Sequence, residues 1–202
     1  MRKANAILYR FRGYILALFA IALIACPAAP FPQGKSISEF VPYIAALFLY
    51  AGGIALRVRA RQYIGQHTRG STHTADELVT DGPYAQCRHP LYTSNLFIAL
   101  GAASFHLGTS QLFVLFAPAL LLFEFALARA EDRFLEEKFG DTWRAWALRT
   151  PMVPSRVAIF TFKSDSAPRR TFLQAFKADA STWFWFVFFN LIIVLLKLHG
   201  LR

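Results

Sequence analysis

Residues 91–130 have the sequence LYTSNLFIALGAASFHLGTSQLFVLFAPALLLFEFALARA, in which two apolar runs, 91–107 and 112–130, are separated by a short connection. Each run approaches the ~20 residues with which a helix crosses the ~30 Å hydrocarbon core of a bilayer. A connection this short joins antiparallel helices, and helices of similar length return the chain to the face from which it entered. The stretch therefore predicts a membrane-spanning helical hairpin.

Three further apolar runs lie outside the hairpin. They are residues 14–31 (YILALFAIALIACPAAPF), 41–56 (VPYIAALFLYAGGIAL) and 183–198 (WFWFVFFNLIIVLLKL). Only 17% of the chain is charged and 55% is apolar, whereas a soluble domain averages about 25% charged residues. We predict an all-α fold, a polytopic integral membrane bundle of about five transmembrane helices. Gly52 and Gly53 give one of these helices a smooth face for close packing.

The positions of Lys and Arg predict the topology. Basic residues gather before the first run, between the second and third, and between the fourth and fifth, while the other two connections hold only Lys35. The positive-inside rule then places the N-terminus and both basic segments in the cytoplasm and the C-terminus outside. The same rule, with attraction to anionic headgroups, explains the net charge of +10 without a nucleic-acid partner.

The N-terminal residues allow a second interpretation. A basic stretch, an apolar run and the letters LIAC resemble a lipoprotein signal, but we expect the first span to be kept, as is normal in a polytopic chain. Residues 68–75 are polar and predict a loop. Two cysteines are too few for a disulfide framework. No ligand spacing for a metal is present among His67, His73, His106 and His199.

The first stretch that suggests chemistry is residues 78–95, LVTDGPYAQCRHPLYTSN. Pro90 suits the first position of the helix that follows. The start of a helix offers free N–H groups and a partial positive charge, which bind a carboxylate or phosphate. Arg88 and His89 would add donors there, and Tyr84 and Tyr92 offer aromatic faces and hydroxyls. Alternatively, His89 only caps the helix.

The second stretch is residues 128–154, ARAEDRFLEEKFGDTWRAWALRTPMVP, which continues the second helix of the hairpin as far as Gly140. Because the hairpin returns to its starting face, the acids Glu131 and Asp132 should lie near the start of the first helix. An anion site beside carboxylates suits a zwitterionic amino acid moiety. Glu124 lies seven residues before Glu131, on nearly the same helix face, and inside the span. It is either functional or a buried structural group.

These two stretches together resemble the isoprenylcysteine carboxyl methyltransferase family, within the wider group that includes phospholipid N-methyltransferases. The matching motifs are GPYAQCRHPLY and, after two spans, EDRFLEEKFGDTWRAWALRTPMVP. The resemblance implies a methyltransferase-like catalytic core at 78–154 within one membrane domain, 1–202, in which 155–202 form an extra C-terminal segment. It also implies S-adenosylmethionine in a cytoplasmic pocket whose contacts are Tyr84, Arg88, His89, Pro90, Tyr92, Glu131 and Asp132.

The sequence departs from the family pattern in four ways. Ser94 stands where the family often has Gly, and the second acid is Asp132 rather than Glu. Trp143 and Trp146 replace two tyrosines, and about 45 residues follow Pro154. We expect the tryptophans to be interfacial anchors. Because the C-terminal extension lies outside the resemblance, the family pattern does not identify the substrate.

The methyl acceptor is expected to be a lipid or lipidated molecule in the bilayer. If it is a prenylcysteine-like or other lipid carboxylate, a cationic side chain should hold it, and Arg144 and Arg149 are the candidates. If it is a phospholipid amine, a carboxylate should accept a proton, and Glu124 is the candidate. Sterol reductases share a similar pattern and use NADPH, so a membrane reductase is a further alternative, and a non-enzymatic scaffold is another.

The last apolar run carries a polar residue, Asn190, near its middle. An unpaired amide in hydrocarbon costs free energy, so Asn190 should face the other helices and bond a partner there. Lys197 should extend to the far membrane surface. We expect this helix to cover one side of the substrate-entry gap or to form a dimer contact, with a peripheral anchor as the alternative.

Overall fold

The computed structural model describes residues 2–64, 75–154 and 166–200, and it confirms the all-α prediction. Most of the predicted loop at residues 68–75 lies outside the described residues. The elements are α1 (Arg2–Ala25), η1 (Ile37–Glu39), α2 (Val41–Tyr63), η3 (Gly82–Ala85), α3 (Pro90–Leu107), α4 (Gln111–Ala147), α5 (Phe172–Ala178) and α6 (Ala180–His199).

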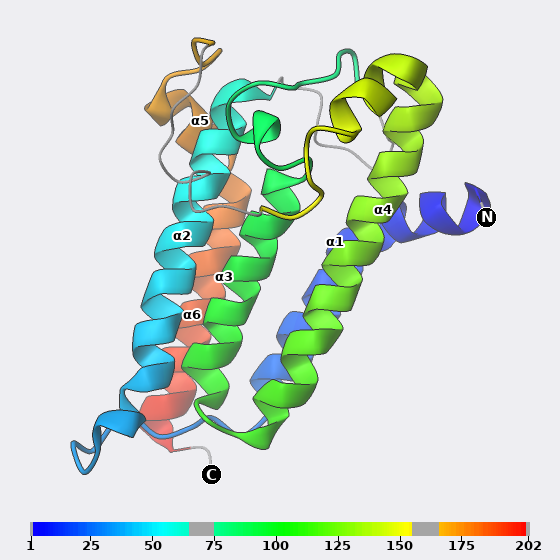
Figure 1. Ribbon diagram of the computed structural model, residues 1–202. Coiled ribbons are helices and arrows are strands. Elements are labelled where there is room, and N and C mark those ends of the chain that lie inside the picture. Colours follow the sequence, from blue (N-terminus) through cyan, green and yellow to red (C-terminus); the bar gives the residue numbers. More distant parts are fainter. Residues whose placement is uncertain (1, 65–74, 155–165, 201–202) are drawn as a thin grey trace.

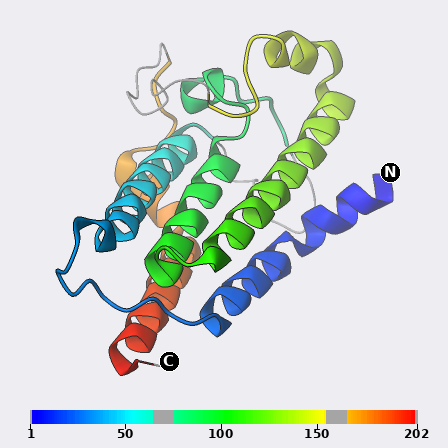
Figure 2. The same ribbon diagram turned by 60° about the horizontal axis from the view of Figure 1, so that its bottom comes forward.

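The long helices form two groups. In Figures 1 and 2, α2, α3 and α6 run side by side, and α1 runs beside α4. The predicted hairpin is present, because α3 and α4 are joined by a short turn and pack against each other. The end of α2, the start of α3 and the second half of α4 meet at one end of the bundle, which we call the basic end.

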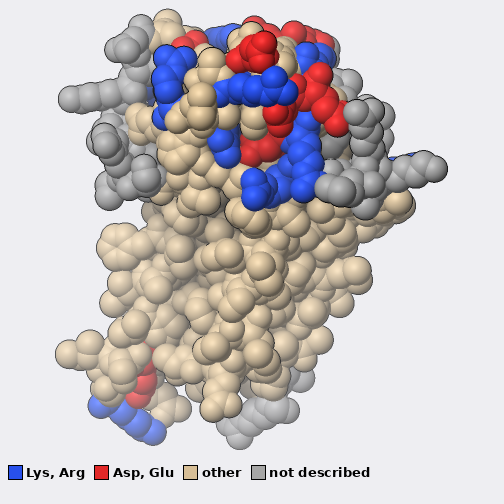
Figure 3. Space-filling model, turned by 45° about the vertical axis from the view of Figure 1, so that its right-hand side comes forward, with Lys and Arg blue, Asp and Glu red and all other residues tan. Residues whose placement is uncertain are grey.

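The surface is that of an integral membrane protein. Four helical stretches in the described chain are long and apolar enough to cross a membrane: Ile7–Ala25, Ile37–Tyr63, Gln111–Ala147 and Ala180–His199. Charged side chains gather at the basic end, above a broad apolar surface (Figure 3). The positive-inside rule predicts that the basic end faces the cytoplasm.

The helix α3, the third predicted span, is not among these four. Its polar side chains bond to neighbouring helices and loops: Ser94 Oγ donates to Gly53 O at 2.9 Å, Ser104 Oγ donates to Pro42 O at 2.8 Å, and His106 Nε2 lies 3.0 Å from Cys26 O. Small and polar side chains are the usual contacts between helices in a membrane. These three polar residues therefore join α3 to the rest of the bundle.

The predicted close packing at Gly53 is confirmed. A Cβ atom at this position would lie 2.8 Å from Ile98 Cγ1 and 3.1 Å from the carbonyl oxygen of Ser94. These distances are shorter than van der Waals contact, so α2 and α3 approach as closely as they do because residue 53 has no side chain.

We expect Gly53→Ala to lower the midpoint of thermal unfolding in detergent, with a cost of about 1–3 kcal/mol for overpacking. The cost exceeds the roughly 1 kcal/mol that Ala gains over Gly in helix propensity. Gly13→Ala in α1 is the control, because no atom lies within 4 Å of its added Cβ. A Gly53→Ala protein as stable as Gly13→Ala would contradict the close packing.

Of two predicted helix ends, one changes and one is confirmed. The first helix ends at Ala25 and not at residue 31, because Pro27 and Pro30 lack the N–H that a helix interior needs. Gly140 ends the first helical part of α4, as predicted: its φ of +52° and ψ of −124° are non-helical and separate two helical parts that meet at a bend. This left-handed conformation favours glycine, and beyond it the chain turns back over the basic end (Figure 1).

The last helix confirms one prediction and corrects another. Asn190 faces the bundle, where Tyr50 Oη donates to Asn190 Oδ1 at 2.7 Å. Lys197 does not extend to the membrane surface, and the prediction that it would is wrong. Its side chain is buried, and its ammonium donates to Ala29 O and, at 3.2 Å, to Tyr43 Oη. The loop after α1 supplies the first of these oxygens and α2 supplies the second, so the ammonium is satisfied inside the protein.

Candidate active site

The two predicted stretches meet at the basic end. The backbone N–H of Arg88 donates to Pro151 O at 2.9 Å, and Cys87 Sγ donates to Met152 O at 3.2 Å. Burial raises the pKa of the Cys87 thiol to about 11, so the thiol stays protonated and serves as a structural contact. Gly82 has φ +58°, and a Cβ there would lie 2.6 Å from the Tyr63 ring, so the turn before α3 requires glycine.

The adjacent acids Glu131 and Asp132 lie in different environments. Asp132 is buried inside the protein. Its Oδ2 accepts from Arg88 Nη2 at 3.1 Å, and its Oδ1 lies 2.9 Å from His89 Nε2. Arg88 Nη1 also donates to Ala147 O at 3.1 Å. His89 is the N-cap residue of α3, but its side chain makes no capping bond there and contacts Asp132. Asp132 instead fixes the two side chains that precede the helix.

Glu131 is the outer member of the pair and lines a cavity. Tyr92 Oη donates to its carboxylate. Tyr84 lines the same cavity and is buried, and its hydroxyl has no hydrogen-bond partner among the residues that the structure describes. Burial raises the pKa of this phenol, so it stays protonated. The hydroxyl is therefore a donor that a bound molecule could satisfy.

The tryptophans are packed into the protein, and the prediction of interfacial anchors is wrong for Trp146. This residue is 6% exposed and packs with Tyr84 and Tyr63, and its indole Nε1 donates to Tyr84 O at 3.2 Å. The Arg88 guanidinium lies 5.7 Å from the centroid of the Trp143 ring. The bend at Gly140 turns this part of α4 back over the basic end, so the two indole rings pack over the residues there.

The cavity, which we call the polar cavity, has a volume of about 530 Å³. This lies within the ~300–1,000 Å³ of small-molecule sites. The structure brings six of the seven predicted cofactor contacts to its wall and places Asp132 behind them. The six are Tyr84, Arg88, His89, Pro90, Tyr92 and Glu131.

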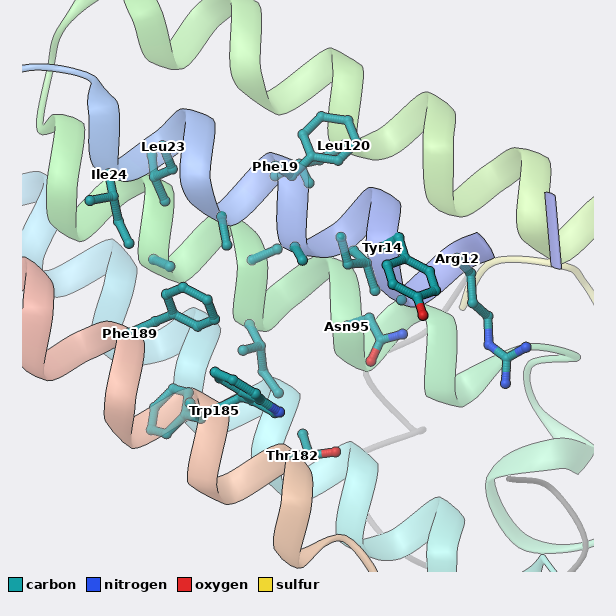
Figure 4. Close-up of a pocket in the computed structure, with 18 of the residues that line it drawn as sticks. Arg12, Tyr14, Phe19, Leu23, Ile24, Asn95, Leu120, Thr182, Trp185 and Phe189 are labelled. Atoms are coloured by element: carbon teal, nitrogen blue, oxygen red, sulfur yellow. The ribbon is translucent and has the colours of Figure 1, made fainter. Parts of the chain in front are cut away.

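A second cavity of about 740 Å³, which we call the apolar groove, runs between α1, α3 and α6. Figure 4 shows Phe19 and Leu23 of α1 on one side, and Trp185 and Phe189 of α6 on the other. The last helix is therefore one wall of the groove, in agreement with the expected position beside the entry gap.

The two cavities meet at a junction. Arg57 lies there: its Nη1 donates to Asn95 Oδ1 at 2.6 Å, and its Nε lies 2.9 Å from Asp179 Oδ2. Asp179 is fully buried and also binds Arg61 Nε at 3.0 Å. From the sequence alone, these arginines indicate only the topology. Six residues line both cavities: Arg12, Gly13, Arg57, Tyr92, Asn95 and Thr182.

A family model described as phospholipid methyltransferase matches residues 41–142, just over half of the 202 residues. This chain belongs to that family. The description of that family names methyl transfer, the reaction that the motifs suggested. The matched region comprises α2, η3, α3 and α4 as far as the bend, so α1, α5 and α6 lie outside it.

Two curated relatives are named for metal resistance. One is the cobalt-zinc-cadmium resistance protein CzcN of Cupriavidus metallidurans, and the other is the nickel-cobalt-cadmium resistance protein NccN of Alcaligenes xylosoxydans xylosoxydans. Each is 33% identical over 146 residues, which are 70% of this chain and 64% and 65% of the relatives. The matched part thus spans less than two thirds of each relative. No solved structure matches the chain. Within residues 2–64, 75–154 and 166–200 there is no group of three or more His, Cys, Asp or Glu that could hold a metal ion.

Glu124 is buried, at 3% exposure, in the membrane-spanning part of α4. Within the described part of the chain, neither carboxylate oxygen has a hydrogen bond of ordinary length and angle, although Asn95 and Arg57 are close enough to act on the carboxylate. Glu124 itself lines neither cavity and lies behind the junction.

The structure does not bring the two predicted cationic residues to either cavity. The Arg144 side chain is 59% exposed and pairs with Glu136 and Asp141, each at 2.9 Å. Arg149 is exposed, and its Nε donates to Ala145 O at 3.2 Å. Both lie beyond the bend at Gly140, on a face turned to solvent, whereas Arg12 of α1 and Arg57 of α2 line both cavities.

Proposed function

We propose that this chain transfers a methyl group from S-adenosylmethionine to a lipid carboxylate, such as a prenylcysteine-like molecule, held in the bilayer. The observation that carries the proposal is the meeting of the two cavities. The polar cavity holds the family motif residues, and the apolar groove is built from membrane-spanning helices. They join at Tyr92 and Arg57, so a molecule in each would place its reactive end at the same point.

The residues around the polar cavity fit this cofactor. S-adenosylmethionine supplies a methyl group on a positively charged sulfur, beside an amino acid moiety and an adenosine. The carboxylate of Glu131 can hold the ammonium group, and the N–H groups at the start of α3 can hold the carboxylate. The unpartnered hydroxyl of Tyr84 offers a further bond. Asp132 keeps Arg88 and His89 in place and makes no direct contact.

The protein contributes mainly position and exclusion of water. Holding two reactants in line lowers the barrier by removing their translational freedom. The lining of the apolar groove strips water from an acceptor whose tail lies between α1 and α6. A carboxylate acceptor attacks without losing a proton, so this reaction needs no general base.

A phospholipid amine is the second candidate acceptor, and Glu124 is the observation that favours it. An ammonium group must lose a proton before it attacks. Glu124 is a buried carboxylate behind the junction, beside Asn95. In this reaction Glu124 would accept the proton through a water molecule.

The test is binding and methyl transfer by the purified protein in a neutral detergent. We expect calorimetry to show binding of S-adenosylmethionine and none of NADPH. With methyl-labelled cofactor, we expect alkali-labile label in N-acetyl-S-farnesylcysteine. Stable label in phosphatidylethanolamine would select the amine reaction. Binding of NADPH alone would show a reductase, and binding of neither would leave a non-enzymatic membrane protein.

A further inference from the structure

The short helix α5, Phe172–Ala178, exposes large apolar side chains although it lies outside the four membrane-spanning stretches. Phe172 is 65% exposed and Leu173 is 58% exposed, and Phe176 is exposed as well. The rings of Phe172 and Phe176 lie together, with their centroids 6.4 Å apart. Ala175 is buried on the side where α5 packs against α2. Exposed apolar side chains that lie together mark an interaction surface.

Both ends of α5 are fixed to the last turns of α2. Before the helix, the backbone N–H of Arg170 donates to Gln62 O at 3.1 Å, and the side-chain amide of Gln62 donates to Arg170 O at 3.2 Å. After it, the carboxylate of Asp179 binds Arg57, and the membrane-spanning helix α6 begins at the next residue. The helix α5 therefore lies at the basic end, beside the point where α2 leaves the membrane and α6 enters it (Figure 1).

The sides of α5 differ in character. With 3.6 residues per turn, Phe172, Phe176 and Leu173 fall within an arc of about 100° on the helix. Gln174 falls nearly opposite this arc, and the exposed Lys177 lies at its border. A helix with an apolar side, a polar side and a basic residue between them lies in the plane of a membrane interface.

The charge of the surrounding segment also fits a phospholipid surface. In residues 166–182, all of which the structure describes, the cationic residues are Arg169, Arg170 and Lys177. The one acid in this segment is Asp179, which is fully buried. Arg169 pairs with Glu77, and Lys177 is exposed beside the apolar side of α5. An exposed ammonium next to apolar side chains is complementary to phosphate groups above acyl chains.

We propose that α5 docks into the phospholipid headgroup layer, with Phe172 and Leu173 among the first acyl carbons and the Lys177 ammonium among the phosphates. The docked helix sets the depth of α6, because the Phe176 ring stacks on Trp183 at 4.9 Å and Trp183 Nε1 donates to Phe176 O at 2.8 Å. Since α6 is one wall of the apolar groove, α5 holds that wall at a fixed level in the bilayer. This role does not depend on the proposed reaction.

The test measures what surrounds α5 in the full-length protein in phosphatidylcholine vesicles. A nitroxide is attached to Leu173→Cys, with Gln174→Cys as the matched control on the opposite side of the helix. Both proteins carry Cys26→Ser, so that the buried Cys87 is the one native thiol left. Collisions with molecular oxygen report contact with lipid, and collisions with a water-soluble nickel chelate report contact with water. We expect the ratio of oxygen to chelate collisions to be several-fold higher at position 173 than at position 174.

A label on Lys177→Cys should give an intermediate ratio, and one on Phe172→Cys should match position 173, which also keeps the test available if Leu173→Cys does not fold. Thermal unfolding in detergent shows which labelled proteins are folded. A label at positions 172 and 173 that collides mainly with the chelate would show that this side faces water and would overturn the proposal. A label there that neither reagent reaches would show that protein covers α5, such as a second copy of the chain, and would overturn it as well.

Discussion

Replacing Glu131 by Gln is expected to weaken S-adenosylmethionine binding by about 100-fold, the largest effect on ligand binding that we predict. Glu131 lines the polar cavity and accepts a hydrogen bond from Tyr92. The substitution keeps the size of the side chain and removes the charge that would hold the cofactor's ammonium. In a partly buried site, the lost ion pair is not replaced by water at equal strength.

Calorimetry with the purified protein measures this affinity, and thermal unfolding in the same detergent shows whether the variant is folded. Glu136→Gln is the control, because Glu136 lies farther along α4, pairs with the exposed Arg144 and lines neither cavity. We expect this control to bind as the wild type does. Equal affinity of Glu131→Gln and wild type would remove Glu131 from the cofactor site.

Replacing Asp179 by Asn is expected to destabilise the protein by about 3–5 kcal/mol, the cost of removing one partner from a buried ion pair. Asp179 is fully buried between α5 and α6 and is the carboxylate that Arg57 and Arg61 share. Without it, two like charges four residues apart on α2 face each other in a site with little water. The extra C-terminal segment would then lose its main polar attachment to the family core.

Thermal unfolding of the detergent-solubilised protein measures this effect. Asp141→Asn is the matched control: its side chain is 96% exposed and pairs with Arg144 on the surface. A surface pair contributes at most about 1 kcal/mol, so this variant should unfold near the wild-type midpoint. Similar midpoints for the two variants would mean that the C-terminal segment is held by apolar packing alone.

The helices, and the hairpin that brings the two motifs together, could be predicted from the amino-acid sequence alone. Apolar length decides whether a helix can cross a bilayer, and this property is local. The hairpin follows because a short turn fixes the direction of α4 relative to α3, so the Arg88 and Glu131 stretches must meet. The inward direction of Asn190 was predictable for the same kind of reason, since an amide in lipid has no alternative partner.

The positions of the residues beyond these helices could not be predicted, because they depend on packing between segments far apart in the chain. Gly140 predicts that a helix stops, but the direction taken by the following residues depends on packing, which buried Trp146 and exposed Arg144. The junction likewise depends on a contact between Arg57 and Asp179, which lie 122 positions apart in the chain. Local charge patterns cannot show such a pair, because an arginine at a helix end is equally compatible with a membrane surface and with a buried carboxylate.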